Sequence, residues 1–183
     1  MFLFEKNSHF NIANIVTFLN IISGIVAIYL VVEGEFFWAA VLAWIGGGFD
    51  ILDGKIARKY HLSTEFGIQL DSFADFVSFV IMPSFFLFFA LKSEGQLNIF
   101  LAGVVFIFYI ISGLRRLIEF NLHANQGSVD KYFTGVPTPL GAILLWILFL
   151  LFKYGVIYNE FLILLLVVIV GVLLNSKIKI PHP

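Results

Sequence analysis

Four aspartates at helical spacing are the residues of this sequence best suited to chemistry. Asp50 and Asp53 lie three positions apart, and Asp71 and Asp75 lie four positions apart. On α-helices the members of each pair share a face, because residues three or four positions apart are neighbours on the helix surface. A short turn between the two helices brings both pairs to the same end, so we expect the four carboxyl groups to converge in one cavity.

Such a cluster cannot persist as four bare anions, because like charges a few ångström apart repel strongly where the dielectric constant is low. Either some carboxyls are protonated or cations lie among them. Carboxylate oxygens suit hard divalent cations, so the cluster predicts two ions, Mg²⁺ or Mn²⁺, which Ca²⁺ could replace. Paired metals are a common device for displacement at phosphorus. A lone aspartate in a membrane helix could instead be a proton site or join two helices.

Three neighbouring residues favour a phosphate-bearing ligand. Gly54 and Gly67 carry no side chain, so a ligand could approach the helix backbone closely. Arg58 adds a planar cation that suits a phosphate oxygen.

The whole string from Asp50 to Asp75, D-x₂-D-G-x₂-A-R-x₈-G-x₃-D-x₃-D, resembles the signature of the CDP-alcohol phosphotransferase family at every defined position. The resemblance implies a homodimeric six-helix membrane enzyme that moves a phosphatidyl-type group from a CDP-linked lipid to an alcohol and releases CMP. It implies that the four aspartates bind two divalent ions and that Asp75 is also the general base. It assigns five residues to the nucleotide and its pyrophosphate: Asp50, Gly54, Ala57, Arg58 and Gly67.

An earlier segment, residues 13–17, resembles the Pro-Asn-x-x-Thr start common in this family, with Ala13 in place of the proline. The resemblance implies that Asn14 and Thr17 face the nucleotide. Hydrogen bonding between helices is an equally good interpretation of these two polar side chains.

Two later segments resemble the phosphatidylserine synthases of the family. Residues 115–121 are similar to an Arg-Leu-Ala-Arg-Phe-Asn element, with Glu119 in place of its second arginine, and residues 132–139 are similar to a Phe-x-Gly-Leu-Pro-Thr-Pro element. The resemblance therefore favours CDP-diacylglycerol or CDP-archaeol and L-serine as substrates. Serine carries a carboxylate, so its site should contain a cation. The residues predicted to bind it are Arg116, Asn121, Lys131 and Thr134, although the cations could instead anchor lipid headgroups.

Two alternatives remain. The acceptor could be glycerol 3-phosphate or inositol phosphate, either of which would favour a denser basic pocket. The chain could instead be a divalent-cation transporter that uses the aspartates as its pathway. That second hypothesis predicts polar residues continuing to the far face, whereas residues 76–90 are almost entirely apolar.

The elements that position these residues follow from composition. Of 183 residues, 60% are hydrophobic and 13% charged, and long apolar runs predict membrane helices. We expect an all-α integral membrane protein with one domain, residues 1–183. Its six predicted spans are residues 12–32, 36–58, 64–91, 97–121, 135–153 and 156–174.

Lysine and arginine fall mainly at one membrane face of this arrangement. The positive-inside bias then places both termini and the aspartates on the cytoplasmic side of a multi-pass protein of the cell membrane. The formal net charge of −1 does not favour nucleic acid as a partner, and the absence of cysteine excludes disulfides and thiolate chemistry. The expected partners are the substrates, membrane lipids and a second copy of the chain.

Overall fold

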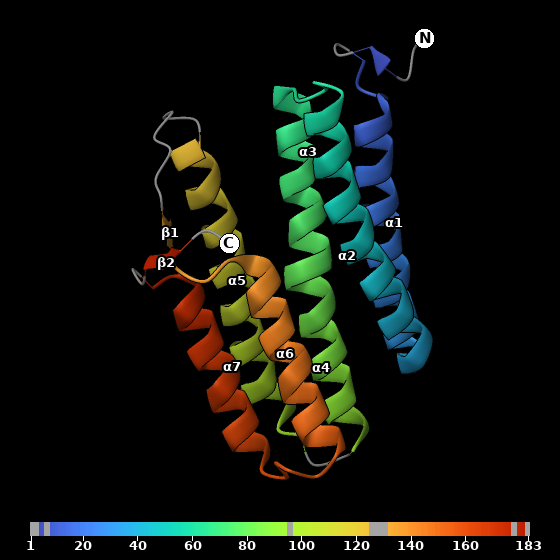
Figure 1. Cartoon of the computed structure of the whole chain (residues 1–183). Helices are drawn as coiled ribbons and strands as arrows, with labels where there is room; N and C mark the ends of the chain where they lie inside the picture. The colour runs from blue at the N-terminus through green and yellow to red at the C-terminus, as the bar shows by residue number, and fades with distance from the viewer. Residues whose placement is uncertain (1–3, 6–7, 95–96, 125–131, 177–178, 182–183) are drawn as a thin grey trace. The chain divides into compact units, whose positions relative to one another are not determined.

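The computed structural model describes residues 4–5, 8–94, 97–124, 132–176 and 179–181 (Figure 1). Helices make up nearly all of this part of the chain: α1 (Ile12–Val32), α2 (Phe36–Lys59), α3 (Glu65–Asp75), α4 (Met82–Ser93), α5 (Ile99–Ala124), α6 (Thr138–Lys153) and α7 (Glu160–Leu174). A π-helix, η2 (Phe76–Ile81), joins α3 to α4. The chain divides into two compact units, the N-terminal unit (residues 1–78) and the C-terminal unit (residues 79–183), which are described separately.

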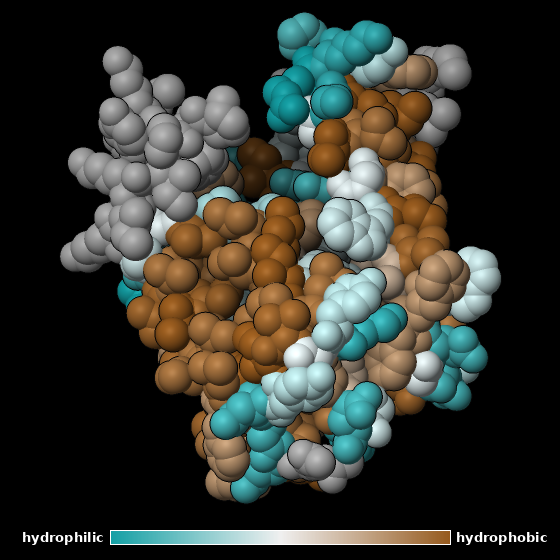
Figure 2. Space-filling model, turned by 60° about the horizontal axis from the view of Figure 1, so that its bottom comes forward, coloured by the Kyte–Doolittle hydropathy of each residue, from teal (hydrophilic) through white to brown (hydrophobic). Residues whose placement is uncertain are grey.

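Four helical segments are long and apolar enough to cross a membrane: Ile12–Val32, Phe36–Lys59, Glu65–Ser93 and Ile99–Leu122. Hydrophobic side chains also cover much of the visible helix surface, as contact with lipid requires (Figure 2). Helices α6 and α7 are apolar but have only 16 and 15 residues, so each extends about 24 Å or less against a hydrocarbon core of about 30 Å. The chain is therefore a multi-pass helical membrane protein, and the count of six spans stays a prediction.

The predicted and observed helix bounds agree closely except near the C-terminus. Helix α6 begins at Thr138 rather than at residue 135, because Gly135 has φ of 87° and Pro137 is the extended N-cap residue. Helix α7 begins at Glu160 rather than at residue 156. Its N-cap Asn159 accepts hydrogen bonds from the backbone N–H groups of the two residues that follow Glu160, at 2.9 and 3.3 Å. Both predicted helices begin too early, because the prediction followed the apolar composition through residues whose backbone is not helical.

A pair of short strands was absent from the predictions. Strands β1 (Tyr132–Thr134) and β2 (Lys179–Pro181) pair antiparallel and form a two-stranded sheet. Three-residue strands carry too little periodicity for a sequence pattern to reveal them.

In the N-terminal unit, α1 packs along both α2 and α3. The α1–α2 turn passes through Gly34, whose φ is 84°. Small residues dominate the helix contacts, including Ala27 and Ala39, which are fully buried. Small side chains let membrane helices approach closely, and this close approach brings the polar side chains of three helices together.

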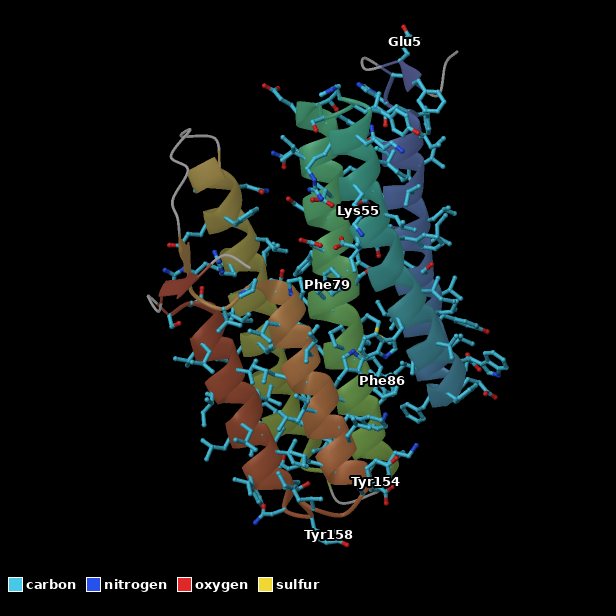
Figure 3. All side chains as sticks on the ribbon, in the orientation of Figure 1. Glu5, Lys55, Phe79, Phe86, Tyr154 and Tyr158 are labelled. Atoms are coloured by element: carbon cyan, nitrogen blue, oxygen red, sulfur yellow. The ribbon has the colours of Figure 1, made fainter. Side chains whose placement is uncertain are left out.

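In the C-terminal unit the core is built from larger side chains. Phe86 of α4, labelled in Figure 3, packs against Trp146 and Phe149 of α6 with ring-centroid distances of 4.5 and 4.8 Å. Tyr154 and Tyr158, also labelled there, are strongly exposed in the α6–α7 connection.

Candidate active site

The turn between α2 and α3 brings the two aspartate pairs together. Helix α2 ends with a Schellman motif, in which the Leu62 N–H donates to the Ala57 carbonyl at 2.9 Å and the His61 N–H donates to the Arg58 carbonyl at 3.4 Å. Helix α3 then begins at once, because the Thr64 hydroxyl accepts a hydrogen bond from the Gly67 N–H at 3.0 Å. This short connection reverses the chain, as the sequence predicts.

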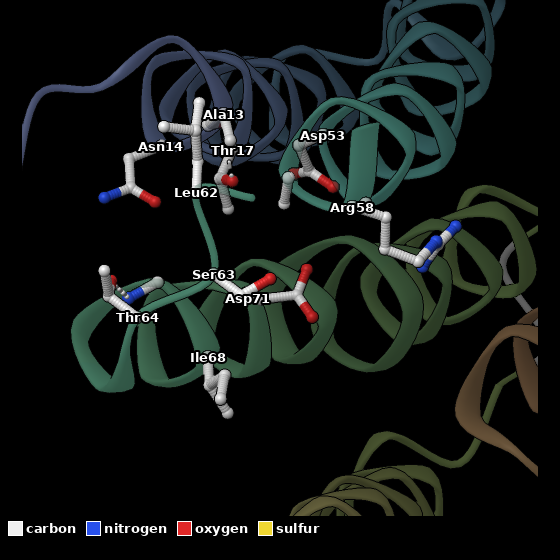
Figure 4. Close-up of a pocket in the computed structure, with 13 residues that line it drawn as sticks. Ala13, Asn14, Thr17, Asp53, Arg58, Leu62, Ser63, Thr64, Ile68 and Asp71 are labelled. Atoms are coloured by element: carbon white, nitrogen blue, oxygen red, sulfur yellow. Dashed lines mark hydrogen bonds between the residues drawn. The ribbon is translucent and has the colours of Figure 1, made fainter. Parts of the chain in front are cut away.

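The structure confirms that carboxyl groups converge. One oxygen each from Asp50, Asp53 and Asp71 lies within 4.8 Å of the other two. Asp75 lies on α3, one turn beyond Asp71, and its carboxyl is within hydrogen-bonding reach of Asp50 on α2. Figure 4 shows Asp53 of α2 and Asp71 of α3 facing the same space. All four predicted ligands therefore belong to one cluster.

Asp53 gives the test of whether a cation fits this cluster. The residue is only 3% exposed, and within the described part of the chain its Oδ2 atom is buried without a hydrogen-bond partner. A buried carboxylate oxygen without a partner is costly, and a bound cation would satisfy it. The donor set is entirely carboxylate oxygen, which suits Mg²⁺, Mn²⁺ or Ca²⁺. The residues present therefore fit a divalent ion.

A cavity of about 220 Å³ adjoins the cluster. Asp53 and Asp71 form part of its wall (Figure 4). Six residues predicted from the resemblance to contact the nucleotide also line it: Asn14, Thr17, Gly54, Ala57, Arg58 and Gly67. Segments from α1, α2 and α3 thus surround one space.

The two glycines of the wall have a more specific role than the sequence suggests. A Cβ atom on Gly67 would lie 3.0 Å from the Asn14 Oδ1 atom and 3.3 Å from the Thr64 hydroxyl, and one on Gly54 would lie 3.4 Å from an Arg58 guanidinium nitrogen. Each glycine therefore makes room first for polar side chains of the protein itself. At Gly67 this close approach holds α3 against the start of α1.

Two contacts orient the side chains that α1 contributes to the wall. The Asn14 amide donates to the His9 carbonyl at 3.0 Å, which leaves its oxygen turned toward Gly67. The Thr17 hydroxyl donates to the Ala13 carbonyl at 3.1 Å and lies within reach of the Asp53 carboxylate.

Comparison with known proteins agrees with this geometry. Residues 10–173 match the sequence profile of the CDP-alcohol phosphatidyltransferase family. The chain belongs to this family. It is 34% identical to a CDP-diacylglycerol–serine O-phosphatidyltransferase of Methanocaldococcus jannaschii, over 98% of this chain and 78% of that protein. It is 32% identical to the protein of that name from Bacillus subtilis, over 91% of this chain and 88% of the relative. An archaetidylserine synthase of Methanothermobacter thermautotrophicus is 29% identical, over 92% of this chain and 69% of the relative.

The residues predicted to bind the acceptor of this CDP-alcohol phosphatidyltransferase belong to the C-terminal unit, whereas the cavity belongs to the N-terminal unit. Arg116 is 6% exposed, and its Nε–H donates to the Val136 carbonyl at 3.2 Å. Asn121 lies further along α5, and Thr134 ends β1. Lys131 lies outside the described residues. The structure therefore tests none of these four assignments.

Sequence reasoning missed some residues of the phosphatidyltransferase site. The cavity wall also contains Leu62, Ser63, Thr64 and Ile68. Thr64 could have been found, because a threonine immediately before a helix is a strong N-cap signal. Asn20 of α1 donates to the Asp50 Oδ1 atom at 3.4 Å, a contact that no spacing rule reveals because thirty residues separate the two.

Proposed function

We propose that this CDP-alcohol phosphatidyltransferase transfers a phosphatidyl or archaetidyl group from a CDP-lipid to the hydroxyl of L-serine and releases CMP. The observation that carries the proposal is the cluster of Asp50, Asp53, Asp71 and Asp75 beside a cavity walled by the other residues of the family signature. The names of the relatives support serine as the acceptor.

The reaction is a displacement at the phosphorus that carries the lipid. The serine hydroxyl oxygen forms the new bond to this phosphorus, the bond to the oxygen shared with the second phosphate breaks, and CMP leaves with that oxygen. Asp75 accepts the proton of the serine hydroxyl, because an alcohol is a weak nucleophile until a base removes its proton. No covalent enzyme intermediate is required.

The four aspartates would hold two divalent ions, whose chemistry is to neutralise the pyrophosphate and the charge that develops on the departing CMP. Arg58 adds a fixed positive charge beside the same cavity, where it can bind a phosphate oxygen. Asn14 and Thr17 supply polar groups at the end of the cavity near α1, which suits the nucleoside.

For the acceptor, we propose that Arg116 pairs with the serine carboxylate, with Asn121, Lys131 and Thr134 contributing polar contacts. The hydrogen bond from Arg116 to Val136 uses Nε, so it orients the guanidinium without using its terminal nitrogens. We also propose that residues 1–183 act as one six-span domain, that two copies associate, and that the site faces the cytoplasm from the cell membrane.

The deciding experiment measures CMP release from CDP-diacylglycerol by the purified protein with Mg²⁺ or Mn²⁺. Serine, glycerol 3-phosphate and inositol phosphate are compared as acceptors, each with and without a chelator. We expect release that requires serine and stops with the chelator. Equal release with all three acceptors, or without any, would contradict serine transfer, and release in the presence of the chelator would contradict the metal requirement.

A further inference from the structure

Asn20 lies at the meeting point of three elements of the N-terminal unit. The residue is fully buried on α1, its Nδ2 donates to the Asp50 Oδ1 atom of α2 at 3.4 Å, and its Oδ1 accepts from the Ser78 hydroxyl of η2 at 2.6 Å. Ser78 is itself 7% exposed. Two hydrogen bonds, one buried and one partly buried, thus run from the aspartate cluster to a serine three residues beyond Asp75.

The direction of these bonds fixes how the amide is turned. A hydroxyl can donate to the Asn20 oxygen, and this leaves the amide N–H₂ group facing Asp50. The opposite orientation would place the amide oxygen against a carboxylate, so two acceptors would face each other in a buried site. The Asp50 carboxylate, which can only accept, therefore excludes the reversed amide, and the Ser78 hydroxyl supports the remaining orientation by donating to the Asn20 oxygen.

Two glycines leave the room that this arrangement needs. A Cβ atom on Gly46 would lie 3.2 Å from the Asn20 Oδ1 atom. One on Gly24 would lie 3.0 Å from the Ser78 hydroxyl and 2.9 Å from a methyl group of Val77. Close helix approach at both points keeps the asparagine, the serine and the aspartate within contact, and a polar amide buried among membrane helices is costly without such partners.

We propose that Asn20 and Ser78 are positioning residues, which hold the Asp50 carboxylate in the orientation that binds a divalent ion. The inference rests on the metal requirement in the proposed function and extends it to residues that touch no substrate. A carboxylate that accepts a directed N–H bond is restrained in rotation, so its position relative to Asp53 and Asp71 is maintained before an ion binds. Hydrogen-bond partners of metal ligands commonly affect metal affinity by about 10- to 100-fold.

The test measures metal binding without turnover. Purified full-length protein is treated with chelator, and its unfolding temperature is followed as Mn²⁺ is added, with no CDP-lipid and no serine. A ligand that binds the folded state raises this temperature by an amount set by the ratio of its free concentration to its dissociation constant, so the titration gives an apparent affinity. The variants are Asn20→Leu, which keeps the number and branching of the side-chain heavy atoms, and Ser78→Ala. The matched control is Ser84→Ala, because Ser84 is 1% exposed and donates only to a backbone group one turn earlier in the chain, the Val80 carbonyl of η2, at 2.6 Å.

We expect Asn20→Leu to weaken the apparent Mn²⁺ affinity about tenfold or more and Ser78→Ala to weaken it severalfold, while Ser84→Ala leaves it unchanged. If Asn20→Leu does not fold, Ser78→Ala decides the matter alone. Wild-type affinity in a folded Asn20→Leu or in Ser78→Ala would overturn the positioning role while leaving the proposed function intact. A wild-type protein whose unfolding temperature does not respond to Mn²⁺ would overturn both.

Discussion

The two units of this phosphatidyltransferase bury different kinds of side chain. In the N-terminal unit the buried apolar residues are mostly alanines, and amides, hydroxyls and Asp53 are buried among them. In the C-terminal unit the buried side chains include large ones such as Phe86, Met82 and Tyr109, and Arg116 is the only charged side chain buried among its described residues. The unit that carries the signature motif thus contains most of the buried polar side chains, and the other unit contains most of the bulky apolar packing.

This difference has a physical cause. The carboxylates of α2 and α3 can share an ion because both helices pack along α1, and close packing of membrane helices requires small side chains at the contacts. Small side chains contribute little dispersion energy, so hydrogen bonds such as those of Asn20 must help to join the helices. The C-terminal unit has no such requirement and can pack large aromatic and aliphatic groups. Substitutions in the first unit should therefore affect activity most, and those in the second, outside the residues proposed to bind serine, should affect stability most.

The largest expected effect is that of Asp53→Asn, which removes the charge but almost no volume. Loss of a group that stabilises transition-state charge commonly costs about 100-fold or more in rate, so we expect at least that loss in CMP release with serine. The control is Glu65→Gln, which removes an exposed acid from the same unit and should keep nearly full activity. Nearly full activity in Asp53→Asn would remove this carboxylate from the chemistry.

Asp75→Asn separates chemistry from binding. The amide cannot accept the proton of the serine hydroxyl, so we expect turnover to fall about 100-fold or more, as for loss of a general base. Nucleotide binding should persist, because Asp75 is absent from the cavity wall and Asp50, Asp53 and Asp71 form a group that could hold an ion without it. Equilibrium binding of CDP measured beside CMP release distinguishes the two effects. A variant with wild-type turnover would exclude Asp75 as the base.

A smaller effect is expected when the cavity wall is altered without any change of charge. In Gly67→Ala the new methyl group would lie 3.0 Å from the Asn14 amide oxygen, so this side chain must move. We expect the KM for the CDP-lipid to rise about tenfold, equivalent to about 1.4 kcal/mol of binding free energy. Gly48→Ala is the matched control, because no atom lies within 4 Å of its new methyl group. Equal KM values for the two variants would contradict a role for this wall in binding.

A substitution in the C-terminal unit should mainly lower the unfolding temperature. Gly135 has φ of 87°, and a Cβ there would lie 2.7 and 2.9 Å from the carbonyl oxygens of Ser176 and Leu174. The left-handed conformation alone costs a non-glycine residue about 1–2 kcal/mol, and the contacts with backbone add to that. We expect Gly135→Ala to lower the unfolding temperature in detergent by about 6 °C or more. In Gly34→Ala, where φ is 84° and no atom lies within 4 Å, the decrease should be about half as large.

The comparison also shows what a sequence can predict. The aspartate spacing predicts a shared cavity because helix periodicity is local and the turn between the pairs is short, and the structure confirms it. The contact between Asn20 and Asp50 depends on which faces of α1 and α2 meet, and that is decided by tertiary packing. Likewise, the start of α6 depends on a backbone angle at Gly135, which apolar content does not reveal.

The smallest expected effect concerns the turn beside the site. Helices α1 and α2 end in the same Schellman motif, with Gly34 at the left-handed position of the first and His61, whose φ is 56°, at that of the second. Replacing the histidine by glycine relieves about 1–2 kcal/mol of backbone strain, because glycine adopts the left-handed conformation without steric cost. Glycine also loses more backbone entropy on folding, which offsets part of this gain. We therefore expect His61→Gly to raise the unfolding temperature by about 1–2 °C. His61→Ala keeps the strain and should give no increase. Because His61 is exposed and absent from the cavity wall, CMP release should be unchanged in both variants. A lower unfolding temperature in His61→Gly would mean that the imidazole contributes more to this turn than its backbone conformation costs.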